Sequence, residues 1–353
     1  MSDIFSPATF RGMKSVYSFV FPEVRRTITD FDAAFSPTLM RVNTPASALG
    51  EFVNGHVSPD LVIPATSTGF ADLDALHAPI MDIVAARVAP YAPGLLDFPN
   101  RYPTAGSSEG LFHLLVNLSN RRIRRIRVLA GEYEGFGIQA ANVGMICETY
   151  RLGRKGDPNS AWAVKPADDA CWFMSSPSAR DGNLLPDDIV SHLSNAGHKI
   201  VLDLAYLGST APTLIDVSHP NIIAVAMSLS KPYGLFRWRI GYLFSRSPID
   251  SLYGSRWFFD AARHLLGVKV LSEIGPTLLQ PRYASAQHAI TDSLAASGIP
   301  LRPSDALILA AMPIKDLAGC SAGVVALLTP FVRADSVRVC LTPYFEATAD
   351  LAR

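Results

Sequence analysis

The stretch Met227-Ser-Leu-Ser-Lys-Pro-Tyr-Gly-Leu-Phe-Arg-Trp-Arg-Ile-Gly-Tyr242 is the most informative part of this sequence. The apolar run that leads into it predicts a buried strand, so Lys231 comes just after a strand end. A lysine amine becomes a nucleophile toward an aldehyde when burial or neighbouring charges lower its pKa. Ser228 and Ser230, with the cation Arg239 eight residues after the lysine, could hold a phosphate ester beside that amine. The alternative is a surface lysine on a strand-to-helix loop.

Two further segments have the composition of a ligand site. Asp203-Leu-Ala-Tyr206 follows a predicted strand and lies twenty-eight residues before Lys231, counted from Asp203. Taken alone, Asp203 could be a strand-end cap. Thr104-Ala-Gly-Ser-Ser-Glu-Gly-Leu111 places a Gly-Ser-Ser turn before an apolar helix. Backbone N–H groups and the helix dipole at such a turn favour a phosphate, although the turn could simply cap the helix.

Together these segments resemble the class I/II aminotransferases, which are pyridoxal-phosphate-dependent enzymes of fold type I in the aspartate-aminotransferase superfamily. The resemblance is carried first by the pattern Ser-x-Ser-Lys-x-x-Gly-x-x-x-x-Arg-x-Gly-Tyr over residues 228–242. It implies pyridoxal 5′-phosphate as the cofactor, held as a Schiff base on Lys231. It also implies that Arg239 and Ser228 bind the cofactor phosphate.

The resemblance assigns roles to the other two segments as well. Asp203 would pair with the protonated pyridine nitrogen, which keeps the ring able to accept electrons from a substrate carbanion. Tyr206 would donate to the phenolic oxygen of the cofactor. Gly106, Ser107 and Ser108 would form the phosphate cradle at the start of the helix.

Two more residues follow from the resemblance, which spans about residues 100–345 and is strongest over 200–242. Tyr133, in Glu132-Tyr-Glu-Gly-Phe136, is the candidate aromatic that stacks on the pyridine ring, with Phe136 second and core packing as the alternative for either. Arg338, on the predicted strand 336–341, would clamp the substrate α-carboxylate through two parallel bonds. A surface salt bridge is the alternative for Arg338.

The family pattern breaks after the predicted strand that ends at Met174. Family members carry Asn-Pro-x-Asn-Pro-x-Gly there, and the second asparagine bonds the phenolic oxygen of the cofactor. This sequence has Ser175-Ser-Pro-Ser-Ala-Arg-Asp-Gly-Asn183, with Ala179 at the asparagine position. Either Asn183 reaches back into the site or the bond is missing, which would change the imine pKa. Ser176, Ser178 and Arg180 could instead contact substrate.

The alternation of predicted strands and helices after Asn100 indicates a mostly parallel sheet covered on both faces. Strands are expected at 124–130, 171–174, 200–204, 222–227 and 240–244, and helices at 72–88, 110–118 and 186–195. The resemblance implies a seven-stranded large-domain sheet flanked by helices, plus a smaller α/β domain. The expected division is an arm over 1–50, a large domain over 51–250, and a long helix with a small domain over 251–353. Residues 1–50 and the tail are expected to share the smaller domain.

Composition restricts the partners. The chain has 353 residues with 31 basic and 31 acidic side chains, so nucleic acid and anionic membranes are not expected as main partners. The basic run Arg121–Arg127 is interpreted as a solvated helix-to-strand junction. The four cysteines are scattered and predict no metal site. The absence of a signal-peptide pattern and of a long apolar run makes the cytoplasm the expected location.

The function expected from these residues is an aminotransferase acting on an α-amino acid, with a homodimer as the assembly that the resemblance implies. The altered segment at Ala179 favours a second hypothesis, a lyase, cyclase or β/γ-replacement enzyme of specialised metabolism. A third is a binding protein that kept the fold and lost the chemistry. The tyrosine that family dimers send into the neighbouring site is not identified, and Tyr17 and Tyr102 are candidates. Arg180 and Arg256 are candidates for a second substrate carboxylate.

Overall fold

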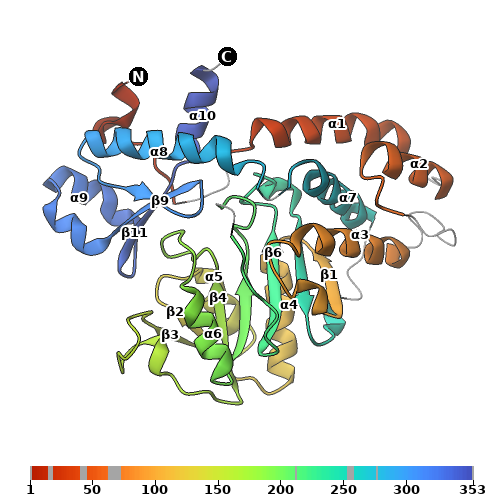
Figure 1. Ribbon diagram of the computed structural model, residues 1–353, viewed down its shortest axis with the longest axis horizontal. Coiled ribbons are helices and arrows are strands. Elements are labelled where there is room, and N and C mark those ends of the chain that lie inside the picture. The colour runs from red at the N-terminus through yellow and green to blue at the C-terminus, as the bar shows by residue number, and fades with distance from the viewer. Residues whose placement is uncertain are drawn as a thin grey trace.

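The computed structural model describes residues 2–14, 19–39, 46–62, 73–210, 213–252, 258–275 and 277–351. Its centre is a seven-stranded sheet in the order β1-β7-β6-β5-β4-β2-β3 (Figure 1). The strands are β1 (Asn100–Thr104), β2 (Arg125–Leu129), β3 (Ile146–Tyr150), β4 (Ala170–Ser175), β5 (Lys199–Asp203), β6 (Ile222–Ser228) and β7 (Gly241–Ser245). Of these seven strands, β7 alone runs in the opposite direction, so its pairings with β1 and β6 are antiparallel and the other four pairings are parallel. The expected mostly parallel, seven-stranded sheet is therefore confirmed.

The central strands are apolar because helices cover both faces of the sheet. Successive residues of β4 point to opposite faces, so Phe173 packs in one hydrophobic cluster and Trp172 and Met174 pack in the other. The first cluster includes α4 (Ser107–Asn120) and α5 (Glu134–Asn142), and the second includes α3 (Leu73–Val88), α6 (Asp187–Asn195) and α7 (Phe258–Glu273). This two-sided burial explains why the central strands are continuous apolar runs.

A second, four-stranded sheet of order β10-β11-β9-β8 lies apart from the large one (Figure 1). Its strands are β8 (Arg302–Pro303), β9 (Leu309–Pro313), β10 (Val332–Arg333) and β11 (Ser336–Cys340). The helices α8 (Gln280–Ala296), α9 (Ala322–Leu328) and α10 (Thr342–Leu351) belong to the same part of the chain.

The N-terminal residues lie against this C-terminal part. Met13 forms a bridge with Cys340, and the Arg11 amide donates to the Tyr344 hydroxyl at 2.9 Å. The rings of Phe5 and Tyr344 are stacked with centroids 5.4 Å apart. After this arm the chain forms α1 (Pro22–Leu39) and α2 (Ala46–His56). The two ends of the chain therefore meet, although the domain boundaries stay a prediction.

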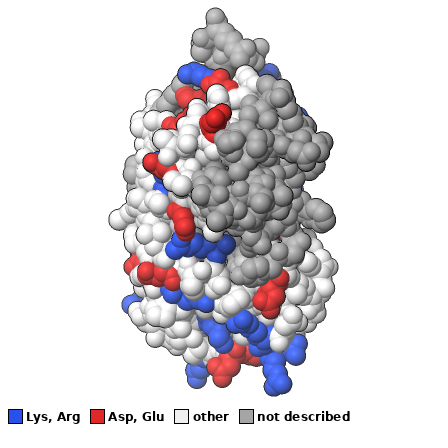
Figure 2. Space-filling model, turned by 90° about the vertical axis from the view of Figure 1, so that its right-hand side faces the viewer, with Lys and Arg blue, Asp and Glu red and all other residues white. Residues whose placement is uncertain are grey.

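Three expectations need correction. The strands β1 and β3 were not expected, and the single long helix expected after residue 245 is two helices, α7 and α8. The junction at Arg121–Arg127 does connect α4 to β2, but it is not fully solvated. Arg127 is 5% exposed and pairs with Glu148 at 3.1 Å, because β2 is an interior strand. On the face shown in Figure 2, the basic and acidic side chains are intermingled.

The described residues contain no helix long and apolar enough to cross a membrane. Within the same residues, no group of three or more metal-ligating side chains comes together.

Candidate active site

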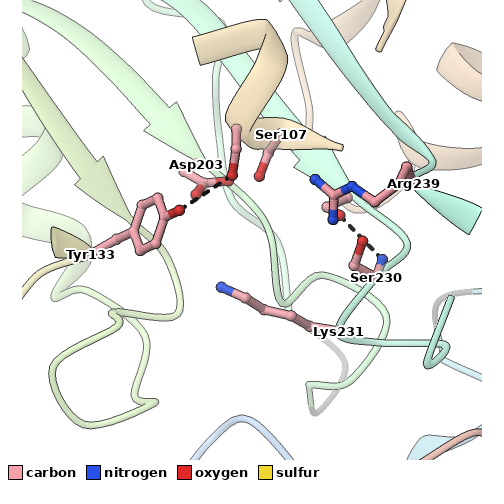
Figure 3. A pocket seen from close by; sticks show the side chains of 8 residues that line it. Ser107, Tyr133, Asp203, Ser230, Lys231 and Arg239 are labelled. Carbon is pink, nitrogen blue, oxygen red and sulfur yellow. Dashed lines mark hydrogen bonds between the residues drawn. The ribbon is translucent and has the colours of Figure 1, made fainter. Parts of the chain in front are cut away.

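A pocket opens at the edge of the large sheet where the parallel strands end. Its walls are formed by residues from five separate segments, namely Ser107, Ser108, Tyr133, Asp203, Ser228, Ser230, Lys231 and Arg239 (Figure 3). Carboxyl ends of neighbouring parallel strands meet at one edge of a sheet, which brings the residue at the end of β5 close to those after β2 and β6. Seven of these eight residues were expected as cofactor ligands from the resemblance, and Ser230 was named only as a residue that could help to hold a phosphate ester.

Lys231 has its amine between two aromatic rings. Its Nζ lies 4.3 Å from the centroid of the Tyr206 ring and 5.7 Å from that of Tyr133. In Figure 3 the lysine side chain points toward Tyr133 and away from Arg239. The alternative of a lysine on the outer surface of a loop is thus not what the structure has.

Asp203 is a buried carboxylate at the end of β5, 3% exposed. Burial raises its pKa to about 6, and the charge of Lys231 opposes that rise. Within the described residues its Oδ1 has no hydrogen-bond partner. A buried, unpaired carboxylate oxygen in a pocket is costly unless a ligand donates to it.

The opposite side of the pocket, here called the cradle, is formed by the backbone of the turn at Gly106 and by the guanidinium of Arg239. Gly106 has φ +87°, and an added Cβ would lie 2.7 Å from Nη2 of Arg239. Arg239 itself donates to the Ala105 carbonyl at 2.8 Å and has φ +54°. The turn therefore needs glycine both for its backbone angle and for the close approach of the guanidinium. Ser107 starts α4 here, so its N–H points out of the helix N-terminus.

Tyr133 lies across the pocket from this cradle. Its hydroxyl is 3.3 Å from Ser108 Oγ. Phe136, the other aromatic candidate, is 1% exposed in the core and meets the Tyr133 ring edge-on at 5.4 Å between centroids. The geometry brings Tyr133 into the pocket and leaves Phe136 behind it.

Arg338 reaches the same site from the small sheet. Its Nη1 donates to the Ala179 carbonyl at 3.0 Å and to the Tyr206 hydroxyl at 3.4 Å, and its Nη2 donates to the Lys14 carbonyl at 3.0 Å. The side chain is buried, and its Nε has no hydrogen-bond partner among the described residues. No carboxylate of that set pairs with it, so the surface salt bridge is not found there.

Other expected residues are not brought to the pocket. Asn183 lies outside the lining set, and its Oδ1 accepts from the Asp305 amide at 3.1 Å. Arg180 pairs with Asp181 at 2.8 Å. The Tyr102 hydroxyl accepts from the Ile249 amide inside the core. Tyr17 and Arg256 lie outside the described residues.

One group at the site was missed from the sequence. Glu132 is 6% exposed, and its Oε1 accepts from Ser178 Oγ at 2.7 Å. Burial raises the pKa of this carboxyl. The position of Glu132 directly before the expected stacking aromatic could have marked it as a site residue. No spacing rule, however, connects it to Ser178, which lies 46 residues further on.

Comparisons with known proteins agree with this geometry. The family model for "Aminotransferase class I and II" matches residues 161–295. No curated protein matches the chain by sequence. Similar solved structures include N-succinyldiaminopimelate aminotransferase from Mycobacterium tuberculosis, with a TM-score of 0.62 and 13% identity over 94% of this chain and 88% of that one.

Two more solved structures have the same fold. A pyridoxal-phosphate-bound C–S lyase from Staphylococcus hominis has a TM-score of 0.62 and 9% identity, covering 94% of this chain and 86% of that one. A methionine aminotransferase from Escherichia coli has a TM-score of 0.57 and 16% identity, covering 94% and 95%. The chain therefore has the fold of these class I/II aminotransferases and pyridoxal-phosphate enzymes, fold type I, and matches the family model over residues 161–295; this similarity indicates pyridoxal 5′-phosphate as the cofactor.

The residues present suit that cofactor. The unpaired Asp203 oxygen suits a protonated ring nitrogen, and the glycine turn with Arg239 leaves the close approach that a phosphate needs. The Ser230 hydroxyl is also buried without a partner among the described residues. A lysine amine stands between these two ends, beside two aromatic rings.

Proposed function

We propose that this chain, which shares the fold of the class I/II aminotransferases and matches their family model in part, is an aminotransferase acting on an α-amino acid. The observation that supports it best is the position of Lys231 Nζ, 4.3 Å from the Tyr206 ring centre in a pocket that Asp203 and Arg239 also line. That arrangement suits a lysine that both holds the cofactor and moves a proton at the substrate.

Each residue then has a defined task. The bound cofactor supplies an electron sink for a carbanion at the substrate Cα. Asp203 accepts from the ring nitrogen and keeps it cationic, while Gly106, Ser107, Ser108, Ser228 and Arg239 hold the phosphate. Tyr133 covers the ring face, and Tyr206 donates to the phenolic oxygen.

The substrate end depends on Lys231 and Arg338. Freed from the cofactor, the Lys231 amine would take the proton from the substrate Cα and deliver it to the C4′ carbon of the cofactor. Arg338 offers its Nε–H, which has no hydrogen-bond partner among the described residues, to the substrate α-carboxylate, while its bonds to Ala179 and Lys14 fix the guanidinium plane.

A second candidate is a pyridoxal-phosphate lyase, cyclase or β/γ-replacement enzyme of specialised metabolism. Ala179 favours it, since its methyl group offers no donor where the family has an asparagine. The likeness to the C–S lyase leaves this chemistry open on the same fold.

Absorbance spectra test both candidates. The purified protein should take up pyridoxal 5′-phosphate and absorb at about 410–430 nm, and Lys231→Ala should lose that band. An aminotransferase converts the cofactor to the pyridoxamine form with some amino acid and releases a keto acid. A lyase instead releases product with altered carbon or heteroatom bonds and leaves the cofactor unconverted. A protein that never binds the cofactor would contradict the proposal.

We also propose that the protein is a cytoplasmic homodimer, as the family resemblance implies. Light scattering of the purified protein should give twice the monomer mass of 38.1 kDa. A monomer that is fully active would contradict this assembly.

A further inference from the structure

Glu132 is a buried carboxyl group that none of the expected roles uses. It lies in the turn after β2, directly before Tyr133. Its two oxygens have different partners. Oε1 accepts from Ser178 Oγ at 2.7 Å, and Oε2 accepts from the Tyr133 amide at 3.4 Å. Burying a carboxyl group costs free energy unless it is hydrogen-bonded, and these two bonds offset that cost for Glu132.

The hydrogen bond to Ser178 joins two loops that face different parts of the site. The turn Gly131–Tyr133 carries the aromatic ring that faces Lys231. The segment Ser175–Asp181 carries Ala179, whose carbonyl binds Arg338. One loop therefore belongs to the cofactor side of the pocket and the other to the substrate side.

The two loops are also in close contact beside this bond. A Cβ added to Gly131, which has φ +83°, would lie 2.7 Å from Cγ of Arg180. A side chain at Gly131 would collide with Arg180, so the turn approaches the segment closely, and the bond between Glu132 and Ser178 links the two loops at this point. Together these contacts fix the distance between the two loops.

We infer that Glu132 is a positioning residue that, through its hydrogen bond to Ser178, holds Tyr133 over the cofactor and ties this ring to the Ala179–Arg338 contact. This inference rests on the proposed function, because it takes Tyr133 to be the residue that covers the ring. It also gives Ser178 a task in the segment where the family motif is broken.

The electrostatics support this position. The charge of Glu132 contributes to the raised pKa of Asp203, so the two carboxyl groups are close enough to interact. Removing the Glu132 charge should therefore alter the ionisation of the bound cofactor, an effect that loss of packing alone would not produce.

The test is a double-mutant cycle on cofactor binding. Ser178→Ala, Glu132→Ala and the double variant are prepared as apo-proteins, and their Kd for pyridoxal 5′-phosphate is measured by absorbance titration. Each single variant should weaken binding by about tenfold, the scale of one hydrogen bond to a charged group. The double variant should bind no more than about twofold worse than Glu132→Ala, because Glu132→Ala already removes the bond that Ser178→Ala would break.

Two controls separate positioning from general damage. Ser176→Ala removes another hydroxyl of the same segment. This hydroxyl accepts from the Leu185 amide rather than donating to Glu132, so the Kd of the variant for pyridoxal 5′-phosphate should stay near that of the wild type. Glu132→Gln keeps an oxygen for Ser178 and loses the charge. It should bind the cofactor better than Glu132→Ala, and it should shift the pH midpoint of the cofactor absorbance.

Multiplicative losses in the double variant, or an equal loss in Ser176→Ala, would overturn the inference. So would a wild-type protein that binds the cofactor and single variants that bind it equally well. A wild-type protein that binds no cofactor would instead contradict the proposed function, and the inference with it.

Discussion

Asp203 shows how a buried carboxyl group in the candidate site can oppose stability. Its pKa is raised from 3.8 to about 6 by burial. Below pH 4 the carboxyl is protonated in both the folded and the unfolded chain, so folding carries no penalty. Above pH 6 it is ionised in both, and the folded state carries the whole cost of burying the charge. The apo-protein should therefore lose stability as the pH rises from about 4 to about 6.

Asp203→Asn should stabilise the apo-protein above pH 6. The expected gain in free energy of unfolding is up to about 3 kcal/mol at pH 8, and it should shrink toward zero at pH 4. Urea unfolding of both proteins without cofactor at the two pH values measures it. With the cofactor bound, the wild type should instead be more stable than Asp203→Asn, since the ring cation of the cofactor pairs with Asp203 but not with asparagine. A variant less stable than the wild type at pH 8 without cofactor would contradict this account.

Arg239 should distinguish the phosphate from the rest of the cofactor. Its guanidinium lies beside the Gly106 turn and bonds the Ala105 carbonyl at 2.8 Å. Arg239→Gln should weaken pyridoxal 5′-phosphate binding by about 10- to 100-fold, the range for a charge-assisted hydrogen bond. Binding of pyridoxal, which has no phosphate, should be almost unchanged. Titration with both compounds is the measurement, and an equal loss for the two would mean that Arg239 does not bind the phosphate.

At the scale of elements, the turn between β1 and α4 combines a backbone requirement with a ligand requirement. Gly106→Ala would introduce a Cβ 2.7 Å from the Arg239 guanidinium at φ +87°. Gly144→Ala is the matched control, because Gly144 has φ +72° and no atom of the described part of the chain lies within 4 Å of the added Cβ. Both variants should lose about 1 kcal/mol of stability from the backbone. Only Gly106→Ala should also weaken cofactor binding, by about tenfold or more. Equal cofactor affinities in the two variants would argue against the cradle.

The same scale shows what the sequence could predict. The strands β4, β5 and β6 are covered on both faces, so their residues form apolar runs that are visible without a structure. The strands β1 and β3 were missed because they lie at the two edges of the sheet. The first contains Pro103, and Ile146 of the second is 62% exposed, so neither has a buried pattern.

The candidate site divides in the same way. Residues fixed by a local motif, such as Lys231 and Arg239, were found because spacing along one segment encodes them. Ser178 was considered only as a possible substrate contact, and Glu132 was missed, because the contact between them depends on where two loops meet in space. The Gly275-Pro276 pair was available as a signal for the end of α7, since helices usually end before proline.

For the whole molecule, the two ends of the chain come together beside Arg338, for which we propose a role in binding the substrate carboxylate. The arm that carries Met13 pairs with Cys340 of β11, and the carbonyl of Lys14 accepts from Arg338 Nη2 at 3.0 Å. Residues more than 320 positions apart thus determine how the buried guanidinium is held. These bonds join the arm to Cys340 and Arg338, neither of which lines the cofactor pocket. Loss of the arm should therefore weaken substrate binding without weakening cofactor binding.

Deleting residues 1–14 should therefore raise KM for the amino acid by about tenfold or more, because Arg338 loses a hydrogen-bond partner and its fixed orientation. The absorbance and Kd of bound pyridoxal 5′-phosphate should change little. A control that lacks only residues 1–4 keeps Phe5 stacked on Tyr344 and the bridge at Met13, and should retain the wild-type KM. Steady-state kinetics and cofactor titration on the three proteins give the answer. If the longer deletion lost cofactor and substrate affinity together, the arm would be stabilising the whole fold and Arg338 would have no separate dependence on it.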